Sequence, residues 1–491
     1  MIMSALPIIP PVAIIAIAFA GAIVIALAAS RPSLRDTLCW LFPLPFFIAI
    51  LGYIEPVVSG AGPTQTLLTL VPGLDIAFAA RPLGLVFTLL ASTLWMLATP
   101  YALGYMKKGG YQNIGRFMAC YAIALGAVAG IAFAENLLTL YLFYEILSIS
   151  TYPLVAHTGT EKARAGARTY LAILLVTSVG LMLPAMVWLW QATGTLSFSS
   201  GGIMAGQVSD TTAAVLLVLL LLGIGKAALM PVHRWLPAAM VAPTPVSALL
   251  HAVAVVKAGV FSVLTVALYI FGLDYLATLI TQPIMLYLAV FTMLAASLVA
   301  LHQDNLKARL AYSTVSQLAY IVTGALLATE LAAIGGGLHM LMHGFGKITL
   351  FFCAGAIYVA SGINTVSGMD GLARRMPLTM LAFFIGALCV IGLPPTGGFW
   401  SKWYLVSGAW EAGYFVVVGA FMLSTLLNVA YLMPPVMRAF LRPPPSDDPV
   451  NYQVNEAPLL CLIPLLITAA GTLVLFVLAD PAYQLLSLGV P

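Results

Sequence analysis

Four of the twenty lysine and arginine residues of this chain lie inside long apolar stretches, where a charge is costly. They are Lys226, Lys257, Lys347 and Lys402. A lysine at the centre of a membrane-spanning helix costs roughly 2.5 to 3.5 kcal/mol on insertion scales. These lysines must therefore be paired, hydrated or neutral. Because burial favours the neutral amine and a nearby carboxylate favours the ammonium, a buried lysine–glutamate pair can take up and release a proton near neutral pH.

Glu145 is the acidic residue that could form such a pair. It lies in the stretch LTLYLFYEILSIS, and no charged residue is nearer in sequence than Glu135. Its counter-ion must come from another helix, and Lys226 is the candidate. The alternative is a neutral acid that is hydrogen-bonded in a contact between helices, but an intramembrane carboxylate is more often functional.

Two further stretches place histidines near the buried lysines. In GGLHMLMHGFGKITLFF, His339, His343 and Lys347 follow one another at four-residue steps. Such residues share one helix face at steps of about 6 Å, which a water or hydroxyl can bridge, so the stripe predicts a proton wire. A metal site at the two histidines is less favoured, because no carboxylate accompanies them in the helix. In SALLHAVAVVKAGVF, His251 and Lys257 lie about 9 Å apart along a helix, where His251 could equally be a packing residue.

Lys307 is a possible accessory residue of this set. It begins the stretch KARLAYSTVSQLAYI, where a basic residue is first of all an interfacial anchor, although it could also face the interior. The same stretch supplies polar groups that could hold water or join helices. They are Ser313, Thr314, Ser316 and Gln317.

Prolines interrupt two of the lysine-bearing stretches. Lys226 lies five residues before Pro231, and Lys402 follows Pro394 and Pro395 in CVIGLPPTGGFWSKWYLV. A broken helix at membrane depth is tolerated chiefly where it lines a cavity or is buried in protein. Because the two broken spans are five apart in order, they indicate a repeat of five helices that is inverted in the membrane.

The composition places all these residues in an integral membrane protein. Hydrophobic residues make up 62% of the 491 residues and charged residues only 7%, against about a quarter in soluble domains. The sequence predicts an all-α membrane fold with about fourteen transmembrane helices, helices 7 and 12 being broken by proline and spans 4–8 and 9–13 forming the two repeats. We expect the spans to begin near residues 6, 37, 76, 115, 136, 166, 211, 244, 282, 307, 332, 376, 413 and 457.

A single polytopic domain, 1–491, is expected to contain four parts. Residues 1–110 would form three N-terminal helices, 111–272 the first repeat, 273–442 the second repeat and 443–491 a C-terminal helix.

The remaining basic residues support this count, because they gather in every second loop. Lys and Arg are enriched on the cytoplasmic side of membrane proteins. The pattern therefore predicts both termini on the non-cytoplasmic side, and only Arg81 is basic there. The loop residues are Arg31, Arg35, Lys107, Lys108, Arg116, Lys162, Arg164, Arg168, Arg234, Lys307, Arg309, Arg374, Arg375, Arg438 and Arg442.

Composition and motifs exclude several other classes of partner. The net charge of +4 is explained by these loops, so the expected surroundings are a lipid bilayer and no nucleic acid. The five cysteines are scattered without a CxxC pair, and we expect no cofactor and no metal. Without a nucleotide loop, flavin motif or cluster ligands, no complete redox reaction can take place in this chain alone.

At the lysine-bearing segments the chain resembles the antiporter-like family shared by Mrp-type cation/proton antiporters, the proton-pumping subunits of respiratory complex I and membrane-bound hydrogenases. The matching stretches cover much of spans 7 to 12. They are KAALMPVHRWLPAAMVAPTPVSALLHAVAVVKAGVF, DNLKARLAYSTVSQLAYI, HMLMHGFGKITLFFCAG and GLPPTGGFWSKW.

The resemblance implies an inverted-repeat fold, discontinuous helices 7 and 12, and a proton path along the middle of the membrane. In this path Glu145 pairs with Lys226, and Lys402 serves the exit half-channel. The relay between them consists of His251, Lys257, His339, His343 and Lys347.

Within the family, we expect the chain to resemble the D type of Mrp antiporter protein. Because the sequence ends soon after span 14, we expect no long lateral helix like that of the largest complex I antiporter-like subunit. Lys402 stands where the complex I M type is expected to carry glutamate. The N type of complex I fits these departures as well, and SALLHAVAVVKAGVF is similar to the larger Mrp A type and the complex I L type. The resemblance implies other membrane subunits as partners and a multi-pass location in a bacterial cytoplasmic (inner) membrane.

Three functions follow as hypotheses. The chain could be part of a cation/proton antiporter that moves H⁺ and Na⁺, or a proton-pumping subunit of an NADH-quinone oxidoreductase-like or hydrogenase complex. It could also be a structural membrane subunit that does not conduct, but the set of buried charges argues against that.

Overall fold

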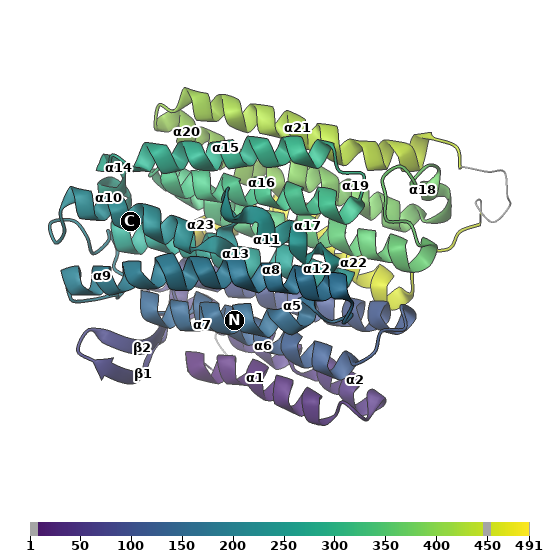
Figure 1. Cartoon of the computed structure of the whole chain (residues 1–491), viewed down its shortest axis with the longest axis horizontal. Helices are drawn as coiled ribbons and strands as arrows, with labels where there is room; N and C mark the ends of the chain where they lie inside the picture. The colour runs from purple at the N-terminus through teal and green to yellow at the C-terminus, as the bar shows by residue number, and fades with distance from the viewer. Residues whose placement is uncertain (1–7, 445–452, 491) are drawn as a thin grey trace.

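The computed structural model describes residues 8–444 and 453–490, which form a bundle of helices running side by side (Figure 1). Within these ranges, ten helices are long and apolar enough to cross a membrane. Four further helices complete the expected fourteen spans. Three are shorter apolar helices, Pro11–Leu27, Asp210–Gly223 and Pro377–Ile391, and the fourth is the more polar helix Leu306–Leu326. The chain is a multi-pass membrane protein, as the composition predicted.

The first three spans include one feature that the sequence did not predict. Helix α1 (Pro11–Leu27) is followed by α2 (Pro32–Leu41), α3 (Pro43–Leu51) and α4 (Ile54–Val58), which together make the second span. Strands β1 (Thr64–Val71) and β2 (Leu74–Ala79) then form an antiparallel hairpin before α5 (Pro82–Lys108). The expected start of span 3 near residue 76 is therefore wrong, because residue 76 lies in β2. The expected start of span 1 near residue 6 lies outside the described residues.

The first five-span unit contains a span broken beside Lys226. It begins with α6 (Ile114–Ala132) and α7 (Leu137–Val155). The next span is one continuous helix made of α8 (Glu161–Thr177), η2 (Ser178–Met182) and α9 (Leu183–Thr193), and α10 (Asp210–Gly223) follows it. After α10 the chain makes only short turns, η3 (Gly225–Ala227), η4 (Val232–Arg234), α11 (Trp235–Ala238) and η5 (Ala239–Val241). The last span runs through α12 (Thr244–Ala248), η6 (Leu249–Val253), α13 (Val255–Thr265) and η7 (Val266–Phe271).

The second unit repeats this order with a span broken beside Lys402. After the short α14 (Leu273–Thr278) come α15 (Gln282–Leu301), α16 (Leu306–Leu326) and α17 (Glu330–Ser361). The short α18 (Leu372–Arg375) precedes α19 (Pro377–Ile391), α20 (Gly398–Glu411) and α21 (Phe415–Leu441). Helices α22 (Leu459–Val477) and α23 (Ala479–Ser487) close the described chain. The predicted divisions at 110, 272 and 442 fall between helices, and the division into four parts stays a prediction.

Local sequence explains where many helices start and stop. Asn136, Thr160 and Asn305 cap α7, α8 and α16, because each side chain accepts a hydrogen bond from a first-turn amide. Proline opens α1, α5 and α19, where its missing amide hydrogen costs nothing. Helix α19 ends at Ile391, and the next residue, Gly392, has a φ of 90° that only glycine adopts easily. The prolines at 394 and 395 cannot continue the helix.

Both ends of the described chain lie on the face that carries the hairpin. Near the start, the Val12 amide donates to Gln65 in β1, and near the end the Tyr269 hydroxyl donates to the Gly489 carbonyl. The hairpin lies at the opposite end of the bundle from α18 (Figure 1). The assignment of the hairpin face to the non-cytoplasmic side stays a prediction.

The interior of the bundle lies around two spans. Every residue from Thr244 to Phe271 is buried, and so is most of α17, whereas α21 exposes much of its surface. These two interior spans carry Lys257, His339, His343 and Lys347, which keeps these ionisable residues away from the outer surface of the bundle.

Candidate functional site

Lys226 lies in the break of the first unit, and its side chain reaches α7. It is fully buried, and Nζ donates to the Ser148 hydroxyl at 2.6 Å and to the Tyr144 carbonyl at 2.8 Å. Nζ also lies 3.0 Å from the centroid of the Tyr144 ring, where the negative face of the ring attracts a cation. Neutral acceptors and one aromatic ring therefore hold this lysine.

Glu145 does not make the direct pair with Lys226 that the sequence suggested. No ion pair with an N···O distance of 4.0 Å or less joins the two residues in the described chain. Both carboxylate oxygens of Glu145 are buried and have no hydrogen-bond partner among the described residues. Lys226 instead contacts Tyr144 and Ser148, which lie on either side of Glu145 in the sequence of α7.

Lys257 and His343 form the closest contact among the predicted residues. Lys257 Nζ lies 2.6 Å from His343 Nδ1, and both side chains are buried. The contact joins α13 to α17, which sequence spacing could not predict because the residues are 86 positions apart. An ammonium can donate to a neutral imidazole and an imidazolium can donate to a neutral amine, so the pair is suited to share one proton.

The stripe on α17 continues from His343 to His339, as the four-residue spacing predicted. The two rings lie nearly parallel with centroids 5.8 Å apart. His339 Nδ1 lies 2.9 Å from the Ser401 hydroxyl, and Nε2 lies 3.1 Å from Gln317 Oε1. His339 therefore connects α17 to both α20 and α16.

Lys347 reaches α16 and α21 through a chain of hydroxyls. Its Nζ donates to Ser313 at 2.8 Å, and Ser313 also accepts from the Tyr431 hydroxyl at 3.0 Å. Sequence reasoning singled out Ser313 as a polar residue of the tenth span but assigned no role to Tyr431.

His251 is placed apart from these contacts. It is fully buried, neither ring nitrogen has a hydrogen-bond partner among the described residues, and its ring packs against Phe351 with centroids 4.8 Å apart. It therefore makes no hydrogen bond to Lys257, six residues further along the same span.

Lys402 lies beyond the second break and has four neutral neighbours. Nζ donates to the Ile391 carbonyl at 2.9 Å, contacts Thr425 Oγ1 at 3.4 Å and lies 4.6 Å from the Tyr320 ring centroid. In the amide orientation that satisfies all its neighbours, Asn428 accepts from the same Nζ at 2.9 Å. Asn428 and Tyr320 were missed by sequence reasoning. Their only signal was a polar or amphipathic residue within an apolar helix.

Lys307 faces the interior rather than serving only as an interfacial anchor. Its Nζ donates to the Ala242 carbonyl at 2.6 Å. It also lines a cavity of about 210 Å³, together with Tyr105, Thr244 and Asn305. This cavity lies beside the start of the span that carries His251 and Lys257.

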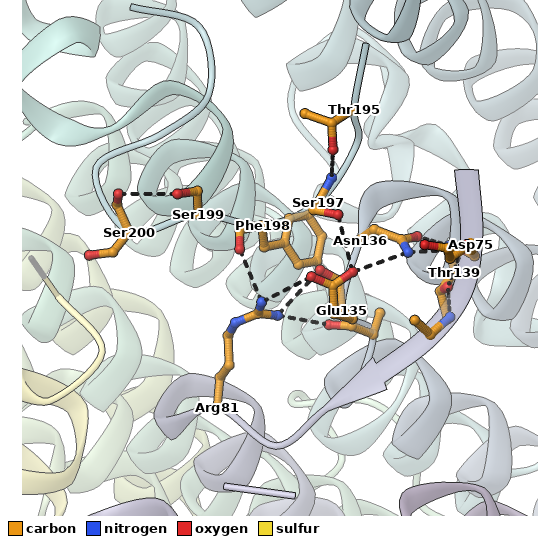
Figure 2. Close-up of polar contacts among 12 residues, drawn as sticks. Asp75, Arg81, Glu135, Asn136, Thr139, Thr195, Ser197, Phe198, Ser199 and Ser200 are labelled. Atoms are coloured by element: carbon orange, nitrogen blue, oxygen red, sulfur yellow. Dashed lines mark hydrogen bonds and ion pairs between the residues drawn. The ribbon is translucent and has the colours of Figure 1, made fainter. Parts of the chain in front are cut away.

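None of the buried lysines has a carboxylate within 4.0 Å in the described ranges, where all ion pairs lie near helix ends. Arg81, on the hairpin face, differs from these lysines because a carboxylate lies beside it (Figure 2). Its guanidinium donates to the Phe198 carbonyl at 3.0 Å, lies 3.5 Å from a carboxylate oxygen of Glu135, and is 5.7 Å from the Tyr269 ring centroid. We call Arg81, Glu135, Phe198 and Tyr269 the Arg81 clasp.

The fold and this set of buried groups define a class: polytopic membrane proteins with two related five-span units, each broken at a buried lysine. Residues 134–428 match the family described as "NADH:quinone oxidoreductase/Mrp antiporter, TM". The chain belongs to this family, which confirms the resemblance seen in the sequence.

Two similar proteins are chains of quinone oxidoreductases. The NADH-quinone oxidoreductase subunit N of Desulforudis audaxviator is 35% identical over 422 residues, covering 82% of each chain. Chain 5 of the NAD(P)H-quinone oxidoreductase of a Synechocystis species is 32% identical over 360 residues, covering 69% of this chain but only 51% of that relative. This chain therefore spans about half the length of the chain 5 relative.

Solved structures show the same fold over nearly the whole length. A chain of the Mrp complex from Dietzia sp. DQ12-45-1b superposes with a TM-score of 0.87 at 22% identity, covering 100% of this chain and 97% of that chain. A chain of the archaeal membrane-bound sulfane sulfur reductase superposes with a TM-score of 0.87 at 23% identity, covering 97% and 96%.

Proposed function

We propose that this chain translocates protons as one subunit of a multi-subunit membrane complex. The observation that carries the proposal is the buried contact of Lys257 Nζ with His343 Nδ1 at 2.6 Å. In the described chain no carboxylate lies within 4.0 Å of this lysine. A permanently charged ion pair would not transfer protons readily, whereas two bases that compete for one proton exchange it with little cost. Intramembrane ionisable residues of this kind mark proton relays in pumps and transporters.

The relay proceeds along α17 toward Lys402. A proton taken up by His343 can pass to His339 through a water or hydroxyl between the parallel rings, whose centroids are 5.8 Å apart. The Ser401 hydroxyl can donate to His339 Nδ1. It can also donate to the Gly398 carbonyl at 3.0 Å and accept a hydrogen bond from a protonated His339. His339 can therefore gain a proton without losing a partner.

The first unit supplies the other end of the path. Glu145 and Lys226 act as the pair that takes up or releases a proton when the lysine leaves Ser148 and reaches the carboxylate. His251 and the Lys307 cavity give access from the face opposite the hairpin. Lys347 and Lys402 form the exit side, and the prolines at 231, 394 and 395 keep the broken spans open to these polar side chains.

For the complex itself, we propose an Mrp-type cation/proton antiporter in which this chain resembles the D type and Na⁺ is exchanged for H⁺. Its partners would be other hydrophobic subunits in a bacterial cytoplasmic membrane. The match to a chain of an Mrp complex over the full length supports this fold, and the retained buried lysines support conduction.

A second candidate is favoured by the 35% identity to a quinone oxidoreductase protein that covers 82% of each chain. In that case the chain would be a proton-pumping subunit of a quinone-linked redox complex. Because this chain has no cluster or nucleotide motif, the energy would arrive from partner subunits.

Purification of the complex in mild detergent, followed by mass spectrometry of all subunits, separates the two candidates. Small hydrophobic subunits without redox centres would support the antiporter, and iron–sulfur or quinone-site subunits would contradict it in favour of the redox complex. A Na⁺ gradient would then drive proton uptake by proteoliposomes that contain the antiporter. Quinone reduction would drive it in proteoliposomes that contain the redox complex. Absence of proton movement with either driving force would overturn the proposed function.

A further inference from the structure

Asn428 is a buried amide in the middle of α21, a helix whose other face is exposed. Sequence reasoning assigned it no role, because it lies in the apolar stretch FMLSTLLNVAYLM. In its satisfied orientation the amide oxygen accepts from Lys402 Nζ at 2.9 Å and from Gln317 Nε2 at 3.1 Å. The amide nitrogen donates to the Tyr431 hydroxyl at 2.6 Å and to the Ser424 carbonyl at 3.1 Å. One side chain thus uses all its hydrogen-bonding capacity.

These contacts make Asn428 the meeting point of three branches. The first branch is the direct contact with Lys402. The second runs through Gln317, whose Oε1 lies 3.1 Å from His339 Nε2.

The third branch runs from Asn428 through the Tyr431 hydroxyl to Ser313 at 3.0 Å and on to Lys347 Nζ at 2.8 Å. The three branches end at three ionisable groups of the second unit, which come from α20 and α17. Asn428 itself comes from α21, so it is the tertiary contact that joins them.

A neutral amide is well suited to this position. In the described chain no carboxylate lies within 4.0 Å of Lys402. The Asn428 oxygen is the nearest side-chain acceptor for Lys402 Nζ, because the Thr425 hydroxyl is further away at 3.4 Å. A carboxylate here would hold the lysine proton in place, and an apolar residue would leave Lys402, Gln317 and Tyr431 short of partners. An amide orients the lysine without fixing its charge.

We propose that Asn428 is a positioning residue that couples Lys402 to His339 and Lys347 during proton transfer. This inference rests on the proposed function and adds to it the residue that links the relay to its exit. The titratable groups that face Asn428 and Lys402 come from α16, α17, α19, α20 and α21. Helix α15 contributes only a hydroxyl among the described residues, that of Ser297, which contacts the Ser424 hydroxyl of α21. The titratable groups are Tyr320, His339, Lys347, Cys389, Lys402 and Tyr431.

The test is the pH profile of proton translocation by the intact complex in proteoliposomes, measured for Asn428→Leu and Asn428→Asp. We expect Asn428→Leu to lower the rate about tenfold at every pH, because the branches are cut. We expect Asn428→Asp to retain more activity than Asn428→Leu but with its optimum at higher pH, because a carboxylate favours the protonated lysine. A merely structural asparagine would not shift the profile.

Thr468→Val is the matched control, because Thr468 is a buried polar residue of α22 whose hydroxyl donates to the Leu465 carbonyl of its own helix. Native pH profiles for both Asn428→Asp and Thr468→Val would overturn the inference. If Asn428→Leu fails to assemble, Tyr431→Phe decides instead. It cuts only the Lys347 branch and is expected to slow translocation, and a native rate would count against the coupling.

The Lys402→Ala variant distinguishes a failure of the positioning role of Asn428 from a failure of the proposed proton path. Loss of translocation in Lys402→Ala with native behaviour in the Asn428 variants would refute the positioning role and leave the path intact. Native translocation in Lys402→Ala itself would contradict the proposed path.

Discussion

The two broken spans hold their lysines in similar surroundings with one chemical difference. Lys226 has the Tyr144 ring, the Tyr144 carbonyl and the Ser148 hydroxyl as neighbours, all from the fifth span. Lys402 has the Tyr320 ring from the tenth span, a backbone carbonyl at Ile391 and the Thr425 hydroxyl. An aromatic face, a carbonyl and a hydroxyl thus recur in both units.

The difference lies in the group that completes each site. In the first unit, the residue after the tyrosine is Glu145, which can change its charge. In the second unit the residue after the tyrosine is apolar, and the neutral amide of Asn428 contacts the lysine instead. Under the proposed function, the first unit would gate protons by forming and breaking an ion pair between Glu145 and Lys226. The second unit would pass them through the hydrogen bonds around Asn428.

The largest expected effect is that of removing the lysine from the first unit. Lys226→Ala should reduce proton translocation in proteoliposomes to background, while the complex still assembles, because this lysine is the ionisable residue that contacts α7 beside Glu145. Lys162→Ala, at an exposed position of α8, is the control and should leave the rate unchanged. Near-native translocation by Lys226→Ala would remove the first unit from the path.

The next effect tests the difference between the units directly. Glu145→Gln gives the first unit a neutral amide like that of the second. We expect at least about a tenfold loss of rate, because an ion pair with Lys226 can no longer form. The measurement is the initial rate of proton uptake by reconstituted vesicles at several pH values. Equal rates for the native and Glu145→Gln complexes would mean that the two units work in the same way.

A smaller effect is expected at the Arg81 clasp, where charges are already paired. Arg81→Ala removes donors to three backbone carbonyls and the ion pair with Glu135, and should lower the stability of the hairpin face by about 1 to 3 kcal/mol. Thermal unfolding of the detergent-solubilised protein measures this, with Lys108→Ala on the other face as control. Translocation should stay near native, and a loss as large as that of Lys226→Ala would contradict the distinction between clasp and path.

The smallest effect concerns the loop before α16. Hydrogen bonds from the Ser367 hydroxyl and amide to Asp304 lower the pKa of this exposed carboxyl below its usual value. A lowered pKa in the folded state stabilises the protein above the carboxyl's ordinary pKa, and this contribution disappears as the pH falls through the lowered value. Ser367→Ala should therefore reduce the melting temperature slightly at neutral pH and progressively less as the solution is acidified through that range. An equal reduction at all pH values would argue against the charge dependence.

Much of the architecture follows from the sequence alone. Apolar length and the alternation of basic loops predict fourteen spans, since each crossing of the hydrocarbon core requires about twenty apolar residues. The interruptions at 231, 394 and 395 predict the two broken spans, because proline cannot supply a helix hydrogen bond. The hairpin was missed, since a short apolar strand pair before α5 has a hydropathy like that of the start of a span.

The ionisable residues themselves were also visible in the sequence, because a charge in an apolar span is costly and therefore rare. The four-residue spacing of His339 and His343 determined their stacking, as both lie on one helix face. Only the tertiary structure decided which groups touch. Lys257 meets His343 across 86 residues, Asn428 meets Lys402 from another helix, and Glu145 has no hydrogen-bond partner in the described part of the chain. Such contacts depend on helix packing and rotamers, which hydropathy and periodicity do not specify.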